Sequence, residues 1–175
     1  MNCHLWVMGK KYRQNVGIIL LKKDAKGRFL IFAGQRISQP ENDKYSWQMP
    51  QGGVDEGEDV LSAAYREMYE EIGVKKENAM LVSKMPHTIK YNFPPEVVEE
   101  HAKKQDYLSQ FCGQEQHWFV FQYFGKDEDI NLYATDEPQE FRTWKWETPK
   151  FLIKHIVPFK KETYKRVFEW LKGVL

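Results

Sequence analysis

The sequence contains very little cysteine. Only Cys3 and Cys112 occur among its 175 residues, far apart and without metal-ligating neighbours in the chain. Such a pair is typical of thiols in a reducing compartment, because secreted domains of modest size usually carry closely spaced, paired cysteines. We therefore expect a cytoplasmic protein.

Long apolar runs are also absent. No stretch approaches the roughly 20 apolar residues that cross a bilayer, so we expect no membrane association. The first eight residues lack the basic segment and long apolar core of a secretory signal. Met8, followed by a basic segment, is an alternative start to Met1, and we expect residues 1–10 to be loosely ordered.

An excess of charge of one sign is lacking as well. The formal net charge is +1, so no global field dictates a nucleic-acid partner. The charge is nevertheless uneven: residues 51–80 hold eight acids and three bases, whereas residues 142–175 hold nine bases and three acids. An acidic metal pocket beside a basic C-terminal surface would suit a polyphosphate on a larger anion. A solvated basic helix explains the C-terminal charge equally well.

The chain length favours one domain, residues 1–175, with a substantial core. Apolar periodicity predicts strands at residues 16–22, 29–33, 79–85, 117–124 and 143–147, a short edge strand at 130–132, and helices at 60–72, 96–105, 149–155 and from 161 onward. We interpret residues 96–105 as part of an insertion that shapes the site. This order predicts an α/β protein in which helices flank a central sheet, an α/β/α sandwich.

The most informative stretch runs from Gly52 to Val74. Residues 60–72 have helical periodicity, and Gly73 suits the left-handed position that ends a helix. Glu67, Glu70 and Glu71, at i, i+3 and i+4, lie within reach of one another. Three ionised carboxylates so close repel, and a shared oxygen-loving cation such as Mg²⁺ would relieve the repulsion. A solvated acidic helix face is the alternative interpretation.

The same stretch resembles the signature of the Nudix hydrolases. That signature is a glycine, five residues, Glu, seven residues, Arg-Glu, an apolar residue, any residue, Glu-Glu, any residue, Gly and an apolar residue. Its fixed places are filled by Gly52, Glu58, Arg66, Glu67, Met68, Glu70, Glu71, Gly73 and Val74. The resemblance implies a Nudix-type sandwich with a mixed central sheet and a loop-helix-loop catalytic motif.

Flanking segments narrow the resemblance to RNA pyrophosphohydrolases and the similar dinucleoside polyphosphate hydrolases. The segments are 12–18, 47–53, 114–119, 140–146 and 159–161, so the resemblance covers nearly the whole chain from Lys11. The chain departs from this subgroup at Gln14, where proline is usual, in the polar stretch 96–109, and in a longer loop at 38–44. These departures concern loops near the site and bear on substrate detail.

Some site residues can be assigned from their chemistry and spacing, and others only from the resemblance. From spacing, Glu67, Glu70 and Glu71 are candidate metal ligands, and one of them or a loop glutamate is the general base. We expect Arg66 to point away from these glutamates and to pair with Glu58. The flexible Gln51, Gly52 and Gly53 segment would present backbone carbonyls to metal or phosphate, unless it is a plain tight turn.

The resemblance adds residues that spacing alone does not assign. It implies Glu140 as a further metal-site carboxylate, although ordinary loop statistics favour a turn residue there. It implies Arg13 and Arg36 as phosphate contacts. It also implies contacts to the 5′-terminal nucleotides from Tyr91, Val157, Phe159 and Lys160. Alternatively, Phe159 covers the core and Tyr91 is a half-buried strand residue.

We therefore predict a metal-dependent hydrolase that converts 5′-triphosphorylated or diphosphorylated RNA to 5′-monophosphorylated RNA and so initiates its decay. Mg²⁺ is the expected cofactor, with Mn²⁺ or Zn²⁺ as substitutes, and a monomer is the expected state. The alternative substrate is diadenosine tetraphosphate or a related dinucleoside polyphosphate. From another class, the chain could be a catalytically silent module that binds RNA ends or nucleotides. The sequence identifies no protein activator.

Overall fold

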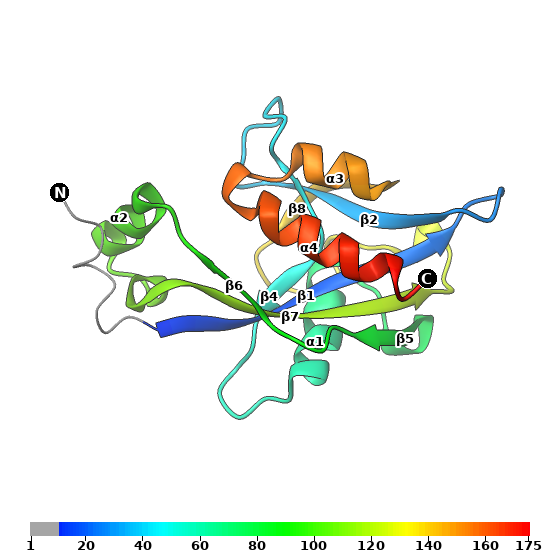
Figure 1. Cartoon of the computed structure of the whole chain (residues 1–175), viewed down its shortest axis with the longest axis horizontal. Coiled ribbons are helices and arrows are strands. Elements are labelled where there is room, and N and C mark those ends of the chain that lie inside the picture. Colours follow the sequence, from blue (N-terminus) through cyan, green and yellow to red (C-terminus); the bar gives the residue numbers. More distant parts are fainter. Residues whose placement is uncertain (1–10) are drawn as a thin grey trace.

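A computed structural model describes residues 11–175 (Figure 1). The expectations for residues 1–10 and for the choice between Met1 and Met8 lie outside this range. The strands are β1 (Lys11–Lys23), β2 (Phe29–Arg36), β3 (Trp47–Gln48), β4 (Gln51–Gly53), β5 (Ala79–Lys84), β6 (Ile89–Asn92), β7 (Phe111–Tyr123) and β8 (Phe141–Glu147). The helices are α1 (Val60–Ile72), α2 (Pro95–Lys104), α3 (Pro149–His155) and α4 (Lys161–Lys172), with short 3₁₀ turns at η2 (Lys76–Asn78), η3 (Tyr107–Gln110), η4 (Asp127–Asp129) and η5 (Pro158–Lys160).

The strands form one mixed sheet in the order β3-β2-β1-β7-β5, with β4 paired to β1, β6 to β7 and β8 to β2. The two longest strands, β1 and β7, are parallel, and the other pairs are antiparallel. Helix α1 covers one face of the sheet, and α3 with α4 covers the other (Figure 1). The predicted α/β sandwich with a mixed central sheet is confirmed.

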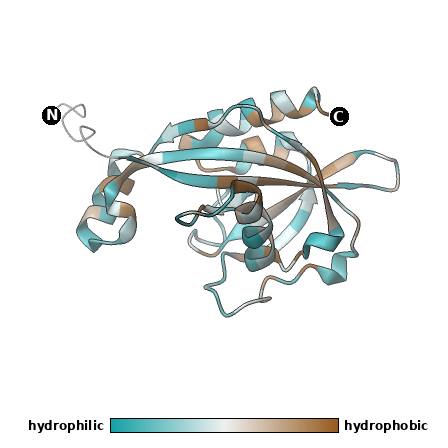
Figure 2. Ribbon diagram, turned by 90° about the horizontal axis from the view of Figure 1, so that it is seen from below, coloured by the Kyte–Doolittle hydropathy of each residue, from teal (hydrophilic) through white to brown (hydrophobic). Residues whose placement is uncertain are grey.

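Burial on both faces explains why β1 is a continuous apolar run. Val16, Ile18 and Leu20 pack toward α1, while Ile19 and Leu21 pack toward α3 and α4. Figure 2 shows hydrophobic residues concentrated where these central strands cross. Since successive side chains on a strand point to opposite faces, each apolar set contributes to its own core. This strand accordingly lies in the middle of the sheet, between β2 and β7.

The sheet divides near its middle, and this division positions the site. Strands β1 and β2 pair only from Leu21 opposite Ile31 to Lys23 opposite Phe29. Farther along, β4 pairs with β1 while β3 and β8 pair with β2. The bend between β3 and β4 therefore lies in the division, where the Ile18 N–H donates to the Pro50 carbonyl at 2.9 Å.

One predicted strand is wrong. Residues 130–132 form no strand, because their backbone bonds locally and to the end of α1: Ile130 N–H donates to Asp127 O, and Asn131 N–H donates to Ile72 O. The structure also contains β3, β4 and β6, which are too short and polar for periodicity to indicate. The predicted insertion helix is present as α2, which lies at the far end of the arm formed by β1, β6 and β7 (Figure 1).

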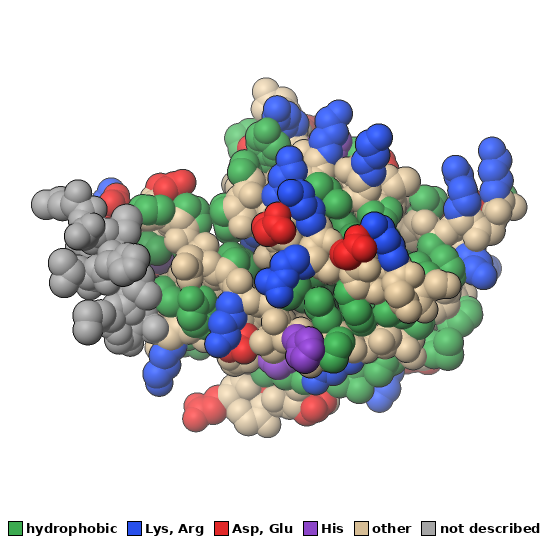
Figure 3. Space-filling model, in the orientation of Figure 1, with side chains coloured by type: hydrophobic (Ala, Val, Ile, Leu, Met, Phe, Trp, Pro, Cys, Tyr) green, Lys and Arg blue, Asp and Glu red, His purple; other side chains and the backbone are tan. Residues whose placement is uncertain are grey.

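Lys and Arg side chains are prominent on the face formed by α3 and α4, as the uneven charge of the sequence suggests (Figure 3). Within residues 11–175, no helix combines the length and apolarity that crossing a membrane requires.

Candidate functional site

Local capping fixes the length and phase of α1. The Asp59 side chain accepts hydrogen bonds from the backbone N–H groups of Leu61 and Ser62 at 3.1 and 3.0 Å, which stabilises the first turn. At the other end Gly73 has φ 69° and donates to Tyr69 O, the left-handed ending that glycine adopts without strain. With Met68 buried toward the sheet, the glutamates of the helix face the side where the sheet divides.

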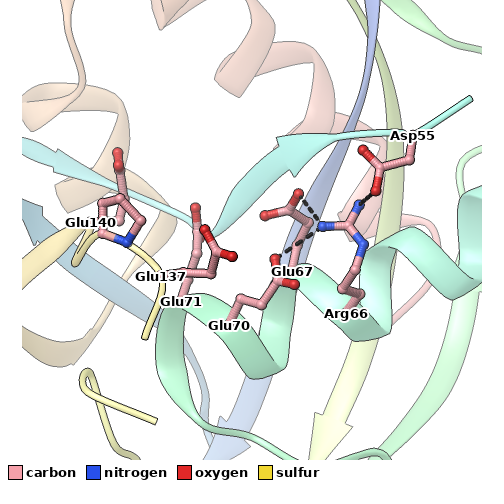
Figure 4. Close-up of a pocket in the computed structure, with 8 residues that line it drawn as sticks. Asp55, Arg66, Glu67, Glu70, Glu71, Glu137 and Glu140 are labelled. Atoms are coloured by element: carbon pink, nitrogen blue, oxygen red, sulfur yellow. Dashed lines mark hydrogen bonds and ion pairs between the residues drawn. The ribbon is translucent and has the colours of Figure 1, made fainter. Parts of the chain in front are cut away.

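An open pocket of about 360 Å³ lies beside α1 (Figure 4). It is lined by Asp55, Arg66, Glu67, Glu70, Glu71, Glu137, Pro138 and Glu140. Six carboxylates from the entry loop, the helix and the loop before β8 thus line the pocket together with one arginine. This is the acidic pocket that the sequence predicts, and it includes the predicted Glu140.

Arg66 pairs with Glu58, as expected, through Nε to Oε1 at 2.8 Å and Nη2 to Oε2 at 2.7 Å. Nη2 also donates to the Gly53 carbonyl at 2.8 Å, which fixes the entry loop against the helix. However, the expectation that Arg66 points away from the other glutamates is wrong. Its Nη1 donates to Glu67 Oε1 at 2.8 Å and to Glu70 Oε2 at 3.0 Å, because the guanidinium is long and carries five donors that reach both sides of the turn.

Glu71 is held differently from Glu67 and Glu70. Its Oε2 accepts a hydrogen bond from the Gln51 backbone N–H at 3.1 Å. Burial, followed by the charges of Glu140 and Glu67, raises the pKa of Glu71 well above its ordinary value. Burial also raises the pKa of Glu67, despite the neighbouring Arg66. These two groups are costly to keep ionised without a cation nearby.

The donor set fits a divalent, oxygen-preferring ion. The acidic side chains of the pocket supply only carboxylate oxygens, the ligand type that Mg²⁺ and Mn²⁺ prefer. Within the described residues 11–175, no three acidic, histidine or cysteine side chains lie close enough together to hold a metal ion as they stand. The pocket is open, so substrate oxygens and water have room to complete a coordination shell.

Two glycines allow side chains to approach the β4 backbone closely. A Cβ on Gly52 would overlap the Glu67 carboxylate, and a Cβ on Gly53 would overlap the Arg13 guanidinium. Arg36 lies nearby, with its Nε donating to Glu140 Oε1 at 3.0 Å. The structure therefore brings both predicted phosphate-binding arginines to β4 or to the acidic pocket.

The predicted nucleotide contacts form one cluster. The Tyr91 ring lies 5.9 Å from the Phe159 ring, and its hydroxyl donates to Gln114 Oε1 at 2.7 Å. Tyr91 is 9% exposed, so it is more buried than the half-buried strand residue of its alternative interpretation; Val157 is 8% exposed and Phe159 is half-buried. Phe159 does pack against the core, as its alternative interpretation proposed.

Lys160 is also buried, with 6% of its surface exposed. Its Nζ donates to Gln51 Oε1 at 3.1 Å and lies 6.0 Å from the Tyr91 ring centroid. Burial, together with the charge of Arg36, lowers the pKa of Lys160 to about 7. Its partners are thus the protein's own amides, which sequence reasoning did not indicate.

The sequence did not indicate that several side-chain amides are buried side by side in the sheet. The Gln116 side-chain amide donates to Asn15 Oδ1 at 3.1 Å and to Gln114 Oε1 at 3.2 Å, and lies 3.4 Å from Gln51 Oε1. Gln114 and Gln116 alternate along β7 and face the Tyr91 side of the sheet. Polar residues at alternating positions in an otherwise buried strand were the available signal.

Comparisons with known proteins agree with this geometry. Residues 11–171 match the NUDIX domain family. The chain is 42% identical over 166 residues to "RNA pyrophosphohydrolase" of Wolbachia pipientis subsp. Culex pipiens, covering 95% of this chain and 93% of that protein. It is 43% identical over 158 residues to "Nudix hydrolase 26, chloroplastic" of Arabidopsis thaliana, covering 89% and 67% respectively.

Among solved structures, a C. elegans Ap4A hydrolase binary complex superposes with a TM-score of 0.61 at 22% identity, covering 92% of this chain and 98% of that one. This likeness concerns the fold. The family match spans the sheet, both helical layers and the glutamate-bearing helix with its arginine, so the chain belongs to the Nudix hydrolase family.

Proposed function

We propose that this protein removes 5′-terminal phosphates from RNA by hydrolysing a pyrophosphate linkage, leaving a 5′-monophosphate. The observation that carries this proposal is the pocket lined by Glu67, Glu71 and Glu140, with Arg36 bonded to Glu140. The relatives named RNA pyrophosphohydrolase, at about 40% identity over most of their length, support the choice of RNA. The protein is proposed to act as a cytoplasmic monomer.

Nudix hydrolases use divalent metal ions, and we propose Mg²⁺ here, with Mn²⁺ or Zn²⁺ as substitutes. The ion would be held by Glu67, Glu70, Glu71 and Glu140. When bound, such an ion neutralises phosphate oxygens and lowers the pKa of an attacking water. A glutamate of the pocket that is not bound to the ion would take the proton from this water.

The remaining residues bind and orient the substrate. Arg13 and Arg36 carry permanent charges with forked donors that match phosphate oxygens. The Gln51 backbone N–H bonds Glu71, and Gly52 and Gly53 lie against the side chains of Glu67 and Arg13, so this segment would help to place the phosphates. Phe159, next to Tyr91 and Val157, offers an aromatic surface for the first bases, and Lys160 adds positive charge behind it.

A second candidate is hydrolysis of dinucleoside polyphosphates such as diadenosine tetraphosphate. The phosphate-binding arginines and the Tyr91–Phe159 pair would accept a base on a polyphosphate without any RNA chain. A silent binding module is less consistent with the site, because Glu58, Arg66 and all three helix glutamates are present and mutually bonded or clustered.

RNA and dinucleotide substrates are separated by comparing kcat/KM on triphosphorylated RNA and on diadenosine tetraphosphate. We expect RNA to be preferred by about 10-fold or more, since stacking of each additional base is worth about 1–3 kcal/mol. Phe159→Ala should reduce kcat/KM on RNA by about 10-fold and harm the dinucleotide less. Phe124→Ala, at an exposed phenylalanine, is the control and should change neither. A strong preference for the dinucleotide would overturn the RNA assignment, and equal losses in Phe159→Ala would make that ring structural.

The pH dependence of stability offers a test that needs no substrate. The folded-state pKa values of Glu67 and Glu71 are raised, so in metal-free protein their contribution to the free energy of unfolding falls as pH rises above about 4.5, their unfolded value. Glu58, whose pKa is lowered by Arg66, makes the free energy of unfolding depend on pH only below about pH 4.5, its unfolded value. Mg²⁺ binds the ionised carboxylates, so we expect it to raise Tm more at pH 8 than at pH 5.5. Thermal unfolding with Mg²⁺ and with chelator measures this; a Mg²⁺ shift that is unchanged in Glu71→Gln would contradict it.

A further inference from the structure

A residue of the C-terminal helix α4 holds the bend between β3 and β4 by a hydrogen bond. The Met49 backbone N–H donates to the Tyr164 hydroxyl oxygen at 2.8 Å. Tyr164 is 0% exposed, and its ring packs edge-on against Trp118 and Phe168, with centroids 5.9 Å away in each case. Tyr164 therefore cannot touch substrate, yet it fixes the backbone at Met49, between Gln48 and Gln51.

Lys160, immediately before α4, holds the same segment by hydrogen bonds to the side chains of Gln48 and Gln51. Its Nζ donates to Gln51 Oε1 at 3.1 Å and to Gln48 Oε1 at 3.4 Å. Because Nζ is the donor in both contacts, the two amide oxygens point toward Lys160. The amide nitrogen of Gln48 consequently faces the other way, 3.5 Å from Glu140 Oε1.

The opposite side of this segment restrains the pocket carboxylates. The Gln51 backbone N–H donates to Glu71 Oε2 at 3.1 Å, and Gln48 approaches Glu140. Residues 48–51 thus lie between α4 and two of the carboxylates that line the pocket, Glu71 and Glu140. Movement of the segment would change the distance and orientation of Glu71 relative to Glu140.

We propose that Tyr164 is a positioning residue for the metal site: by fixing Met49 it holds residues 48–51 so that Gln51 and Gln48 orient Glu71 and Glu140 for a divalent cation. This inference rests on the proposed function in one respect, that these two carboxylates bind the ion. Groups that orient metal ligands without touching the metal commonly affect its affinity by about 10- to 100-fold.

The test is Mn²⁺ binding without substrate, followed by electron paramagnetic resonance, in Tyr164→Phe. This change removes one oxygen, keeps the ring and leaves the charge unaltered. We expect the Mn²⁺ Kd to rise about 10-fold, with kcat reduced at fixed metal, KM for RNA nearly unchanged and kcat restored at high Mn²⁺. Tyr123→Phe is the matched control, because the Tyr123 hydroxyl also bonds one backbone group, Lys126 O, at 2.7 Å. It should lose stability without any change in Mn²⁺ Kd.

Gln48→Met is a second neutral variant that acts on the same segment, and it should also raise the Mn²⁺ Kd. Lys160 is not substituted, because loss of its charge would itself change cation affinity. If Glu71→Gln loses Mn²⁺ binding while Tyr164→Phe and Gln48→Met bind like wild type, the positioning role is refuted and the metal site stands. If Glu71→Gln binds Mn²⁺ as tightly as wild type, the metal site and the inference are both refuted.

Discussion

Glu71→Gln is expected to lower kcat on triphosphorylated RNA by about a thousandfold or more, with the fold intact. Glu71 is the pocket carboxylate with the strongest reason to bind a cation: burial and the charges of Glu140 and Glu67 raise its pKa well above the ordinary value. A neutral amide of the same shape keeps the packing and an oxygen for the Gln51 N–H, but it removes the charge that attracts the ion.

The same substitution should raise the Tm of the metal-free protein. Without a cation, the negative charge of Glu71 is destabilising at neutral pH, so its removal relieves repulsion and desolvation together. Lost activity combined with gained stability identifies a functional carboxylate, since a structural group would lose both. Glu77→Gln, on the exposed η2 turn, is the matched charge control and should leave kcat and Tm near wild-type values. A Glu71→Gln protein that retained turnover within tenfold of wild type would contradict this role.

Gly52→Ala is expected to reduce kcat by about a hundredfold, although it adds only one methyl group. The new Cβ would overlap the Glu67 carboxylate, so this carboxylate must move away from its position in the pocket. Glycine is required here for close approach and not for its backbone freedom, since Gly52 does not have a positive φ. Steady-state kinetics and Mn²⁺ titration should both show the defect.

Gly53→Ala provides the comparison one residue away. Its Cβ would displace the guanidinium of Arg13, which is proposed to bind phosphate. We therefore expect a raised KM for RNA with unchanged Mn²⁺ affinity, the opposite division of effects from Gly52→Ala. Identical kinetic defects in the two variants would indicate general distortion of β4 and would argue against separate metal and phosphate roles.

Helix α1 could be predicted to the residue because its determinants are local. Its apolar periodicity, the aspartate before its first turn and the glycine after its last turn all belong to one short stretch. Its glutamates were found for the same reason. The long strands β1 and β7 were also recognisable, although each extends farther toward its N-terminus than its apolar run, because polar residues such as Asn15 and Gln116 continue the pairing.

Contacts between distant segments could not be predicted in this way. The bond between Tyr164 and Met49 joins residues 115 positions apart, and the burial of Lys160 depends on where η5 meets the division in the sheet. In the sequence, Lys160 is one of many bases in a basic C-terminal segment. Only the fold distinguishes this buried amine from exposed neighbours such as Lys161. Glu140 was assigned by resemblance, because a single glutamate in a loop carries no periodic signal.

The most direct test of the central claim is the position of a bound ion. Crystals of the protein grown with Mn²⁺ and a non-hydrolysable RNA 5′-triphosphate analogue, measured at the manganese absorption edge, would locate it by anomalous scattering. We predict an anomalous peak within coordination distance of Glu71 and at least one of Glu67 and Glu140, with a phosphate oxygen completing its shell. Manganese bound only away from this pocket, or an analogue bound with no metal between it and these carboxylates, would contradict the account.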